Sequence, residues 1–512
     1  MPERASTLTS LCMTICKPSS WLIMVGFLET DDAIVVGGGL AGVSCALALA
    51  DAGKSVVLIE ARRFLGGRVA SVEHPRLHFQ MDNCQHAAFR VYSRFFQFLL
   101  RCNAQRAMKI QKKTILPFFD PKSQKFASLI SGKLNPPNHM AKSMLKFPFL
   151  GLKDKLAMRK IIKKLDKMTE DEIWALDDIS FYDWLIEHKQ TFEAIERFWG
   201  FFILAALNIG VKEASAAQGC MLYKTGIFGS SDAFDVACFQ HHLSHIFQSE
   251  ILETLQGAGV KVELSSSVNS VEVDTKGECT VSTNQKTYHG QQVVLATPPH
   301  ITKKLLRSSG SILTTSKEKL DTFEEIEYTA LMGIHSFYRG EKVPKTFAFS
   351  AIIDEPLIQM VFNRNHELQE QIAPGIQWIS VPVSHADDFL NLNDEEILVE
   401  LERVLGRMFP DTKDNLPVET LIVRMPKATF APRPGTARLR PKPDYIHPSI
   451  LLAGCYTATK WPSTMEGAVR SGCIAASQIL GHQWDPDSNW SGWPSPPERN
   501  DDTIAEWRFT HG

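Results

Sequence analysis

The sequence lacks the features that mark several common classes of protein. No apolar run approaches the roughly 20 residues that a membrane-spanning helix needs, and the run at residues 21–28 covers only eight. The ten cysteines are scattered, without C-x-x-C pairs or metal-ligand spacing. The net charge of -2 gives no general attraction to nucleic acid. These absences predict a cytoplasmic protein with reduced, mostly buried thiols, no bound metal and no nucleic-acid partner.

The length and the ends of the chain set its expected outline. The 512 residues, 44% of them apolar, suffice for two or three domains with a large core. We expect residues 1–30 to be a disordered N-terminal extension, or to result from a start site placed too early. Residues 482–512 mix tryptophans with Pro, Ser, Asn and Asp, and we expect them to be a mostly disordered tail.

Near the N-terminus, a strand, a glycine turn, a helix and a second strand follow one another. Apolar residues 33–36 predict a buried strand, and G-x-G-x-x-G follows through Gly37, Gly39 and Gly42. Helical spacing comes next, and the strand predicted at residues 56–59 ends at Glu60. This order is the dinucleotide-binding fingerprint in its required context, which favours cofactor binding over a chance glycine turn.

Each position of the fingerprint has a physical role. Gly37 allows the tight turn, Gly39 lets the backbone approach a pyrophosphate, and Gly42 lets helix and strand pack closely. Amides at the helix start, together with the helix dipole, bind the phosphate charge. Glu60 lies 23 residues after Gly37, where a carboxylate can accept hydrogen bonds from ribose hydroxyls.

Two polar stretches follow the fingerprint. Residues 61–68 hold Arg62, the pair Gly66 and Gly67, and Arg68, which can meet a phosphate or a flavin edge. The alternative is an ordinary glycine loop with a surface arginine. Residues 82–86, D-N-C-Q-H, place several hydrogen-bonding side chains between apolar segments. They suggest the wall of a site, although a polar turn is a fair alternative.

Helical patterns dominate residues 90–235. Within them, residues 142–167 carry nine Lys and Arg against two Asp, interleaved with apolar residues. Such a helix can rest on an anionic membrane surface, or it can simply be a solvated face. Residues 198–211 form an uncharged run that predicts a buried helix, either core or the lining of an apolar pocket.

Three segments together resemble the FAD-dependent amine oxidase and phytoene desaturase superfamily. They are the first strand with its glycine turn, the A-R-x-x-x-G-G-R run at 61–68, and the A-G…E-G-A…S-G run at 453–472. The resemblance implies an α/β fold with FAD as cofactor: a discontinuous Rossmann-like FAD-binding domain and an inserted α+β substrate domain. We assign residues 31–95, 236–300 and 441–481 to the first domain, and 96–235 and 301–440 to the second. Further FAD contacts are implied at Val268, Gly454, Cys455, Glu466, Gly467 and Ala468.

A narrower resemblance is to the squalene-associated FAD-dependent desaturases, the hydroxysqualene dehydroxylases of hopanoid biosynthesis. It rests on residues 82–86, on 205–208 with 213–216, on 428–432 with 438–441, and on 452–472. Two departures stand out: Cys84 replaces a glycine, and Cys455 replaces the acid that hydrogen-bonds the FAD ribityl chain. A thiol is a weak hydrogen-bond partner, so the second departure should cost ~0.5–1.5 kcal/mol of FAD binding.

This resemblance implies reduction of hydroxysqualene to squalene by reduced FAD, with an unidentified electron donor. The helix that opens at 466–468 would stabilise charge on the flavin, and His86 or Asp82 would donate the proton. Trp199, Phe202, Asn208, Tyr456 and Trp461 are the candidates for contacting a triterpene substrate. Residues 142–167 would hold the protein peripherally on the inner face of the membrane. The alternatives are a carotenoid or phytoene-type desaturase, an amine oxidase, and a non-catalytic FAD-fold lipid-binding protein.

Overall fold

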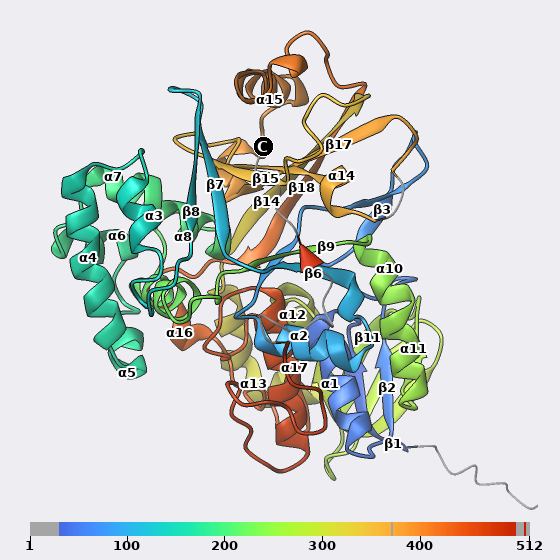
Figure 1. Cartoon of the computed structure of the whole chain (residues 1–512). Helices are drawn as coiled ribbons and strands as arrows, with labels where there is room; N and C mark the ends of the chain where they lie inside the picture. Colours follow the sequence, from blue (N-terminus) through green and yellow to red (C-terminus); the bar gives the residue numbers. More distant parts are fainter. Residues whose placement is uncertain (1–29, 370–371, 498–505, 508–512) are drawn as a thin grey trace, which may run out of the picture.

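A computed structural model describes residues 30–369, 372–497 and 506–507. The extension expected at residues 1–29 lies outside the described residues. Figure 1 shows two sheet-containing parts, one carrying α1 and α17 and the other carrying α15, with a group of helices to one side.

The first sheet draws its seven strands from distant parts of the chain, in the order β10-β2-β1-β13-β12-β11, with β19 paired to β13. The strands are β1 (Thr30–Val36), β2 (Val56–Ile59), β10 (Lys261–Glu263), β11 (Val268–Val273), β12 (Cys279–Thr283), β13 (Thr287–Leu295) and β19 (Ile450–Leu452). β1 lies parallel to both β2 and β13. Its residues alternate between two apolar cores, with Val35 in one and Ile34 in the other. Such a strand is buried on both faces, which is why it reads as a continuous apolar run.

Helices cover both faces of this sheet. One core includes residues of α1 (Leu40–Asp51), α2 (Ser93–Arg101), α10 (Leu243–Gln248), α11 (Glu250–Gly257) and α17 (Met465–Ile479). The other includes residues of α12 (Pro299–Arg307) and α13 (Gly310–Asp321). α1 and α17 approach so closely that a Cβ at Gly472 would lie 2.2 Å from the Ala41 carbonyl oxygen. Helices α2 and α12, which continue past residues 95 and 300, and α13, which follows α12, also pack on this sheet.

Both insertions contribute to the second sheet, whose order is β18-β14-β17-β16-β15-β7-β8. Its strands are β7 (Ile115–Asp120), β8 (Lys125–Ile130), β14 (Tyr328–Arg339), β15 (Phe349–Ile352), β16 (Met360–Asn363), β17 (Ile376–Ser384) and β18 (Glu419–Phe430). The short helix α14 (Arg364–Glu367) follows β16, and α15 (Asp394–Met408) packs on the sheet through Ile397 and Leu401.

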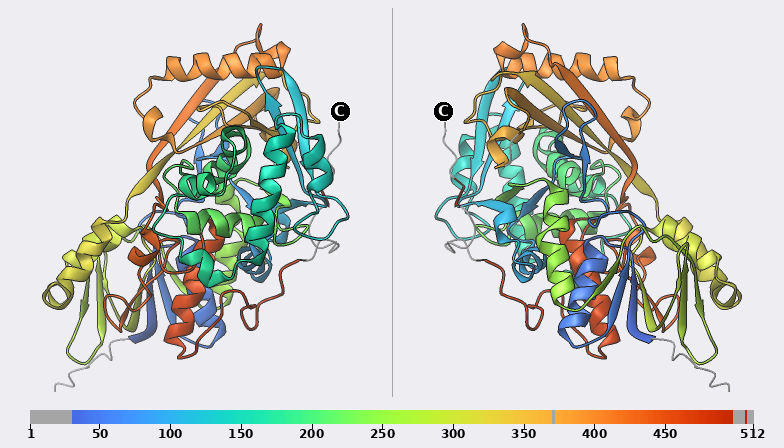
Figure 2. Two further views of the ribbon diagram at one scale, coloured as in Figure 1. Left: turned by 90° about the vertical axis from the view of Figure 1, so that its left-hand side faces the viewer. Right: turned by 90° about the vertical axis from the view of Figure 1, so that its right-hand side faces the viewer.

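The helical group belongs to the first insertion (Figure 2). It contains α3 (Ala141–Lys146), α4 (Leu152–Lys167), α5 (Glu170–Trp174), α6 (Phe181–Glu187), α7 (Phe192–Ala194), α8 (Gly200–Leu207) and α9 (Ala216–Met221), with π-helical turns at Ile195–Trp199 and Leu222–Ile227. Its core is aromatic: Phe181 stacks on Tyr223 with ring centroids 5.8 Å apart, and Trp199 meets Tyr223 at 4.5 Å. Among the described residues, no helix has both the length and the apolar character needed to cross a membrane.

Smaller elements join these parts. A two-stranded sheet pairs β3 (Ser71–Glu73) with β4 (Gln80–Asp82), and a four-stranded sheet holds β5 (Ala87–Phe89), β6 (Met108–Gln111), β9 (Val236–Phe239) and β20 (Glu506–Trp507). The helix α16 (Thr436–Leu439) and the 3-10 turns Gln105–Ala107, Thr322–Glu324, Ala386–Phe389 and Pro410–Thr412 complete the list.

The segment after α17 differs from the disordered tail that we expected. In residues 482–497, Trp490 and Trp493 are buried against the core that contains α2. Gln97 of α2 accepts a hydrogen bond from the Trp490 amide, and the Trp493 indole donates to Asp51 over 2.8 Å. The prediction was wrong here because the polar residues around the tryptophans concealed an apolar anchor.

Candidate functional site

The glycine turn at the end of β1 has the geometry that its sequence predicts. Gly37 has a φ of 110°, and its amide donates to the Ile59 carbonyl oxygen over 2.8 Å. A Cβ at Gly42 would lie 1.9 Å from the Gly37 carbonyl oxygen, so no larger residue fits there. The strand and α1 can therefore pack closely only with glycine at both positions.

A second glycine loop lies directly beside the first. The Gly66 amide donates to the Gly38 carbonyl oxygen over 2.8 Å, and Gly39 bridges to Gly66 as adjacent strands do. A Cβ added at Gly39 would meet only the Gly67 Cα, at 3.9 Å. The Arg62 guanidinium donates to the Gly67 carbonyl oxygen over 3.0 Å and steadies the loop. The two loops therefore form one backbone surface without side chains.

Glu60 lies at the base of this surface. One carboxylate oxygen accepts from the Gly38 amide over 2.7 Å, and the other accepts from the Arg62 amide over 2.8 Å. The Glu60 carbonyl oxygen accepts from Ser266, two residues before Val268 at the start of β11. The sequence thus placed Glu60 correctly at the turn, and the fold brings the segment leading to Val268 to the same strand end.

The start of α1 is open to an anion. Gly39 is its N-cap residue, and among the described residues no side chain caps the helix there. Its first turn carries no acidic residue either. Free amide groups, a positive helix end and a surface of glycine backbone together suit the pyrophosphate of a dinucleotide. The residues present therefore fit the FAD that the sequence implies.

The other end of the chain reaches this site through Arg68. Its guanidinium donates to the Cys455 sulfur over 3.0 Å and also to the Ala428 carbonyl oxygen. The Cys455 sulfur lies 3.0 Å from the Ser463 hydroxyl, and the Arg440 guanidinium donates to the Cys455 carbonyl oxygen. Burial raises the pKa of the Cys455 thiol, but Arg68 above all, with Ser463 and Arg440, brings the pKa below its usual value. The Cys455 sulfur is therefore a direct partner of Arg68.

Glu466, in the first turn of α17, has a structural role. The buried Glu466 carboxylate accepts from the Phe95 amide over 2.8 Å and from the Arg470 guanidinium over 2.7 Å. This side chain fastens α2 to α17, so the FAD contact implied at Glu466 is left to its backbone. A Cβ at Gly467 would lie 2.4 Å from the Pro462 carbonyl oxygen, because the preceding loop folds tightly over the helix start. The backbone of residues 466–468 is therefore what remains for FAD, and the same helix contacts the glycine after β19 through the Ser471 hydroxyl, which accepts from the Gly454 amide over 2.8 Å.

Asp82 proves to be an anchor. Its carboxylate accepts from the Ser71 hydroxyl over 2.7 Å, from the Leu243 amide over 2.9 Å and from the Arg364 guanidinium over 2.8 Å. Burial alone would raise the pKa of Asp82, but His242 and Arg364 outweigh burial and hold the pKa at about 2. A carboxylate ionised at neutral pH has no proton to give. The prediction that Asp82 donates a proton is therefore wrong.

The hydrogen bond of His86, four residues after Asp82, determines which of its ring nitrogens carries the proton. Its Nδ1 lies 3.0 Å from the Cys84 carbonyl oxygen, which can only accept, so Nδ1 carries the proton. Burial lowers the pKa of His86, and the charges of Arg364 and Arg68 add to the effect. The imidazole is therefore neutral at pH 7, with Nε2 free of a proton.

Two residues of α14, Arg364 and Glu367, contribute to this part of the site and were not predicted from the sequence. Arg364 bridges Asp82 and Glu367, with its guanidinium 2.5 Å from the Glu367 carboxylate. The Gln85 amide also donates to Glu367 over 3.1 Å. Burial raises the pKa of Glu367 despite these partners. The R-x-x-E spacing on a single helical turn was the only signal, and it does not reveal contact with residues 82–86.

The residues expected to contact substrate are mostly packed elsewhere. Trp199 is fully buried in the helical core and donates to Gln190 over 2.9 Å, and Phe202 packs against Phe234 at 5.4 Å. Asn208 hydrogen-bonds the hydroxyls of Thr329 and Thr429. These three residues hold the insertion together and line no described pocket, because each is enclosed by its neighbours.

The remaining two substrate candidates lie beside Cys455. Tyr456 is buried, with its hydroxyl 3.4 Å from that of Thr302. The Trp461 ring is buried under the Arg470 guanidinium at 4.1 Å. Both therefore support the loop that follows β19, and the structure gives neither an exposed face.

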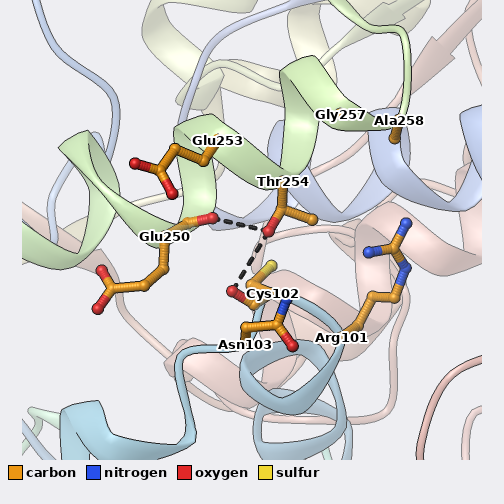
Figure 3. Close-up of a pocket in the computed structure, with 8 residues that line it drawn as sticks. All are labelled: Arg101, Cys102, Asn103, Glu250, Glu253, Thr254, Gly257 and Ala258. Atoms are coloured by element: carbon orange, nitrogen blue, oxygen red, sulfur yellow. Dashed lines mark hydrogen bonds between the residues drawn. The ribbon is translucent and has the colours of Figure 1, made fainter.

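One pocket of the protein lies away from the glycine turns. The hollow of about 360 Å³ is bounded by the end of α2 and one side of α11 (Figure 3). Its lining consists of Arg101, Cys102, Asn103, Glu250, Glu253, Thr254, Gly257 and Ala258. Arg101 is paired there with Asp51, at the opposite end of α1 from Gly39. This hollow is not part of the dinucleotide site.

Residues 40–480 match the sequence profile of the flavin containing amine oxidoreductases. The chain belongs to this family. Its cofactor is FAD, and it is an FAD-dependent oxidoreductase of the amine oxidase and desaturase superfamily. FAD supplies hydride chemistry when bound, while the residues described above bind and orient it.

Curated relatives of this flavin family act on different compounds. The chain is 22% identical over 482 residues to a 15-cis-phytoene desaturase of an Oncidium hybrid cultivar, covering 88% of this chain and 78% of that protein. It is 24% identical over 453 residues to the hydroxysqualene dehydroxylase of Zymomonas mobilis subsp. mobilis, covering 88% of this chain and 99% of that protein.

Solved structures share the fold at lower identity. A double mutant of putrescine oxidase matches with a TM-score of 0.65 and 18% identity, covering 89% of this chain and all (100%) of that one. An oxidoreductase from Methanosarcina mazei matches with a TM-score of 0.67 and 15% identity, covering 86% of this chain and 98% of that one. These likenesses confirm the α/β fold and leave the substrate open.

Proposed function

We propose that the protein reduces hydroxysqualene to squalene. The observation that carries this proposal is the match to the dehydroxylase along 99% of its length, whereas the phytoene desaturase is matched along 78% of its length. Residues 82–86, which carry part of the narrower resemblance, lie on the Arg68 side of the site, where the Asn83 side-chain amide donates to the Arg68 carbonyl oxygen over 2.9 Å. Both relatives are named for polyisoprenoid substrates, so either activity would require an apolar substrate.

The reaction requires a hydride and a proton. A C–O bond breaks, a C–H bond forms at the same carbon, and the hydroxyl leaves as water after gaining a proton. An external donor restores the reducing equivalents. The chain itself must supply the proton at the departing oxygen.

His86 is our candidate for this proton transfer. In its neutral form, Nδ1–H is directed to the Cys84 carbonyl oxygen and Nε2 carries no proton. Only the imidazolium could donate from Nε2, and burial with two nearby arginines lowers the pKa of His86. Turnover should therefore rise as pH falls below about 6.5, the ordinary value for histidine. A pH profile of kcat tests this, and a His86→Gln variant should lose the acid-side rise.

The central test is single turnover without oxygen. FAD-loaded protein is reduced with dithionite and mixed with hydroxysqualene, and squalene is measured by gas chromatography with mass spectrometry. We expect about one squalene per flavin, with reoxidation of the flavin absorbance at the same rate. Folded, FAD-loaded protein that forms no squalene would refute the proposal.

The second candidate is a phytoene-type desaturase, which oxidises its polyisoprenoid. It is favoured by the similarity to phytoene desaturases, of which the Capsicum annuum protein is a further example at 22% identity over 463 residues. Oxidised enzyme with phytoene and a quinone acceptor would form conjugated polyenes, visible by absorbance. Amine oxidation, tested with a panel of amines, and a non-catalytic lipid-binding role, indicated by folded protein without flavin absorbance, are the remaining alternatives.

A further inference from the structure

Helix α4 has one buried side and one exposed side. The buried residues Asp154, Met158, Ile161 and Leu165 recur at helical spacing. At 3.6 residues per turn, the opposite side carries Leu152 and Leu156 in its first half and Arg159, Lys163 and Lys167 in its second half. The exposed side is thus apolar at one end and basic at the other.

A third leucine joins the apolar end. Leu145 of α3 is 65% exposed, beside Leu152 at 67% and Leu156 at 54%. The Lys155 ammonium donates to the carbonyl oxygens of Leu145, over 3.0 Å, and Phe147, over 2.7 Å. These bonds hold the end of α3 against the first turns of α4. We call Leu145, Leu152 and Leu156 the leucine patch. Figure 1 shows α4 at the outer edge of the molecule, away from both large sheets.

Cations surround the leucine patch. The exposed basic residues are Lys142, Lys146, Lys153, Arg159, Lys160, Lys163, Lys164 and Lys167. None of them forms an ion pair within residues 30–369, 372–497 and 506–507. Asp154 is turned inward to the Thr191 hydroxyl and the Gly151 amide. Among the exposed acids nearby, Asp166 and those of α5 lie at the far end of α4. Glu193 and Glu196 are also exposed, and they follow Thr191, whose hydroxyl donates to Asp154 in the first turn of α4. The exposed cations of α3 and α4 outnumber these acids. The surface around the leucines is therefore basic.

We propose that the leucine patch and its basic rim dock the protein onto an anionic lipid surface. Single exposed leucines are ordinary, but leucines on adjoining turns within a ring of unpaired cations match what a charged bilayer surface binds. Apolar side chains enter the headgroup boundary, and lysines and arginines meet the lipid charge. This inference does not depend on which polyisoprenoid is the substrate.

Sedimentation with vesicles tests the proposal on the full, FAD-loaded chain. One set of vesicles is pure phosphatidylcholine, and the other also contains phosphatidylserine. We expect binding to the anionic vesicles, weakening as salt rises, and little binding to the neutral ones. The Leu152→Glu/Leu156→Glu double variant should bind at least about tenfold more weakly. Its matched control, Leu416→Glu/Val399→Glu, alters residues that are each 63% exposed outside the patch and should bind as the wild type does.

A second readout guards against a folding artefact. Leu156→Cys, carrying an environment-sensitive dye in a chain with Cys12 and Cys16 changed to Ser, should shift its emission to the blue on anionic vesicles. A dye at Leu416→Cys should not. No binding to anionic vesicles would overturn the proposal, as would equal binding to neutral vesicles or equal losses in the patch and control variants. Self-association abolished by the patch variant would instead assign the surface to a second copy of the chain.

Discussion

Replacing Asp82 by Asn separates an anchoring role from a catalytic one. Asparagine keeps the shape and can still accept from Ser71 and Leu243, but it removes the charge that faces Arg364. Asp82 has a folded pKa of about 2 against an ordinary value of 3.8. At 1.36 kcal/mol per pH unit, this difference corresponds to about 2 kcal/mol of stability at neutral pH.

The pH dependence of this loss has a definite sign. Because the folded pKa is depressed, the charge of Asp82 stabilises the protein fully above about pH 4, the unfolded value. The contribution disappears as pH falls from about 4 to about 2. The difference in the free energy of unfolding between the wild type and Asp82→Asn should therefore be constant from pH 7 to about 5 and become smaller below about pH 4. Arg364 retains Glu367 as a partner, so the loss should stay below the 3–5 kcal/mol typical of an isolated buried charge.

Thermal melts of FAD-loaded protein across this pH range provide the measurement. An Asp154→Asn variant is the control, because Asp154 is buried and hydrogen-bonded to Thr191 and Gly151 and forms no ion pair with any other described residue. This variant therefore reports the effect of exchanging a buried carboxylate for an amide without the loss of an ion pair. Folded, FAD-loaded Asp82→Asn should also retain the kcat of the wild type. If Asp82→Asn melts at the wild-type temperature, or is stable but has lost turnover, the conclusion that Asp82 acts as a structural anchor is contradicted.

Three further changes test the cofactor site and the C-terminal anchor. Gly42→Ala should abolish flavin absorbance or soluble expression, since its Cβ would lie 1.9 Å from the Gly37 carbonyl oxygen, while Gly257→Ala, with nothing within 4 Å, should be harmless. Cys455→Asp should bind FAD as tightly as the wild type or more tightly, by fluorescence titration of the flavin, and weaker binding would refute our account of Arg68. Trp490→Ala should cost about 3–5 kcal/mol in denaturant unfolding, and a loss below about 1 kcal/mol would mean that residues 482–497 are not anchored.

Local patterns carried most of what could be predicted. The strand at residues 33–36, the glycine turn and Glu60 lie within one βαβ unit, so their geometry follows from spacing alone. The capping box at Asn393 and Glu396, which begins α15, is likewise local. Where neighbouring residues determine the structure, the sequence was a sufficient guide.

Long-range partners account for what was missed. Arg364 lies 282 residues from Asp82, and Glu466 lies 371 residues from the Phe95 amide that it accepts from. No periodicity links such positions, and a carboxylate next to a motif reads as functional until its partner is known. Trp199 illustrates the same limit, because an aromatic in an uncharged helix suits a pocket wall and a core equally well.

Cys455 shows why a missing family acid need not weaken the site. An acid there would answer the positive charge of Arg68, which is 387 residues away in sequence. The loss of FAD binding expected from the sequence assumed an ordinary thiol that gives Arg68 no comparable partner. The Arg68 guanidinium, the Ser463 hydroxyl and Arg440 lower the pKa of the thiol against the effect of burial, so the sulfur is a better partner for Arg68 than an ordinary buried thiol would be. Serine has similar size, but its hydroxyl is a much weaker acid than a thiol, so Cys455→Ser should weaken FAD binding, whereas Cys455→Asp should not.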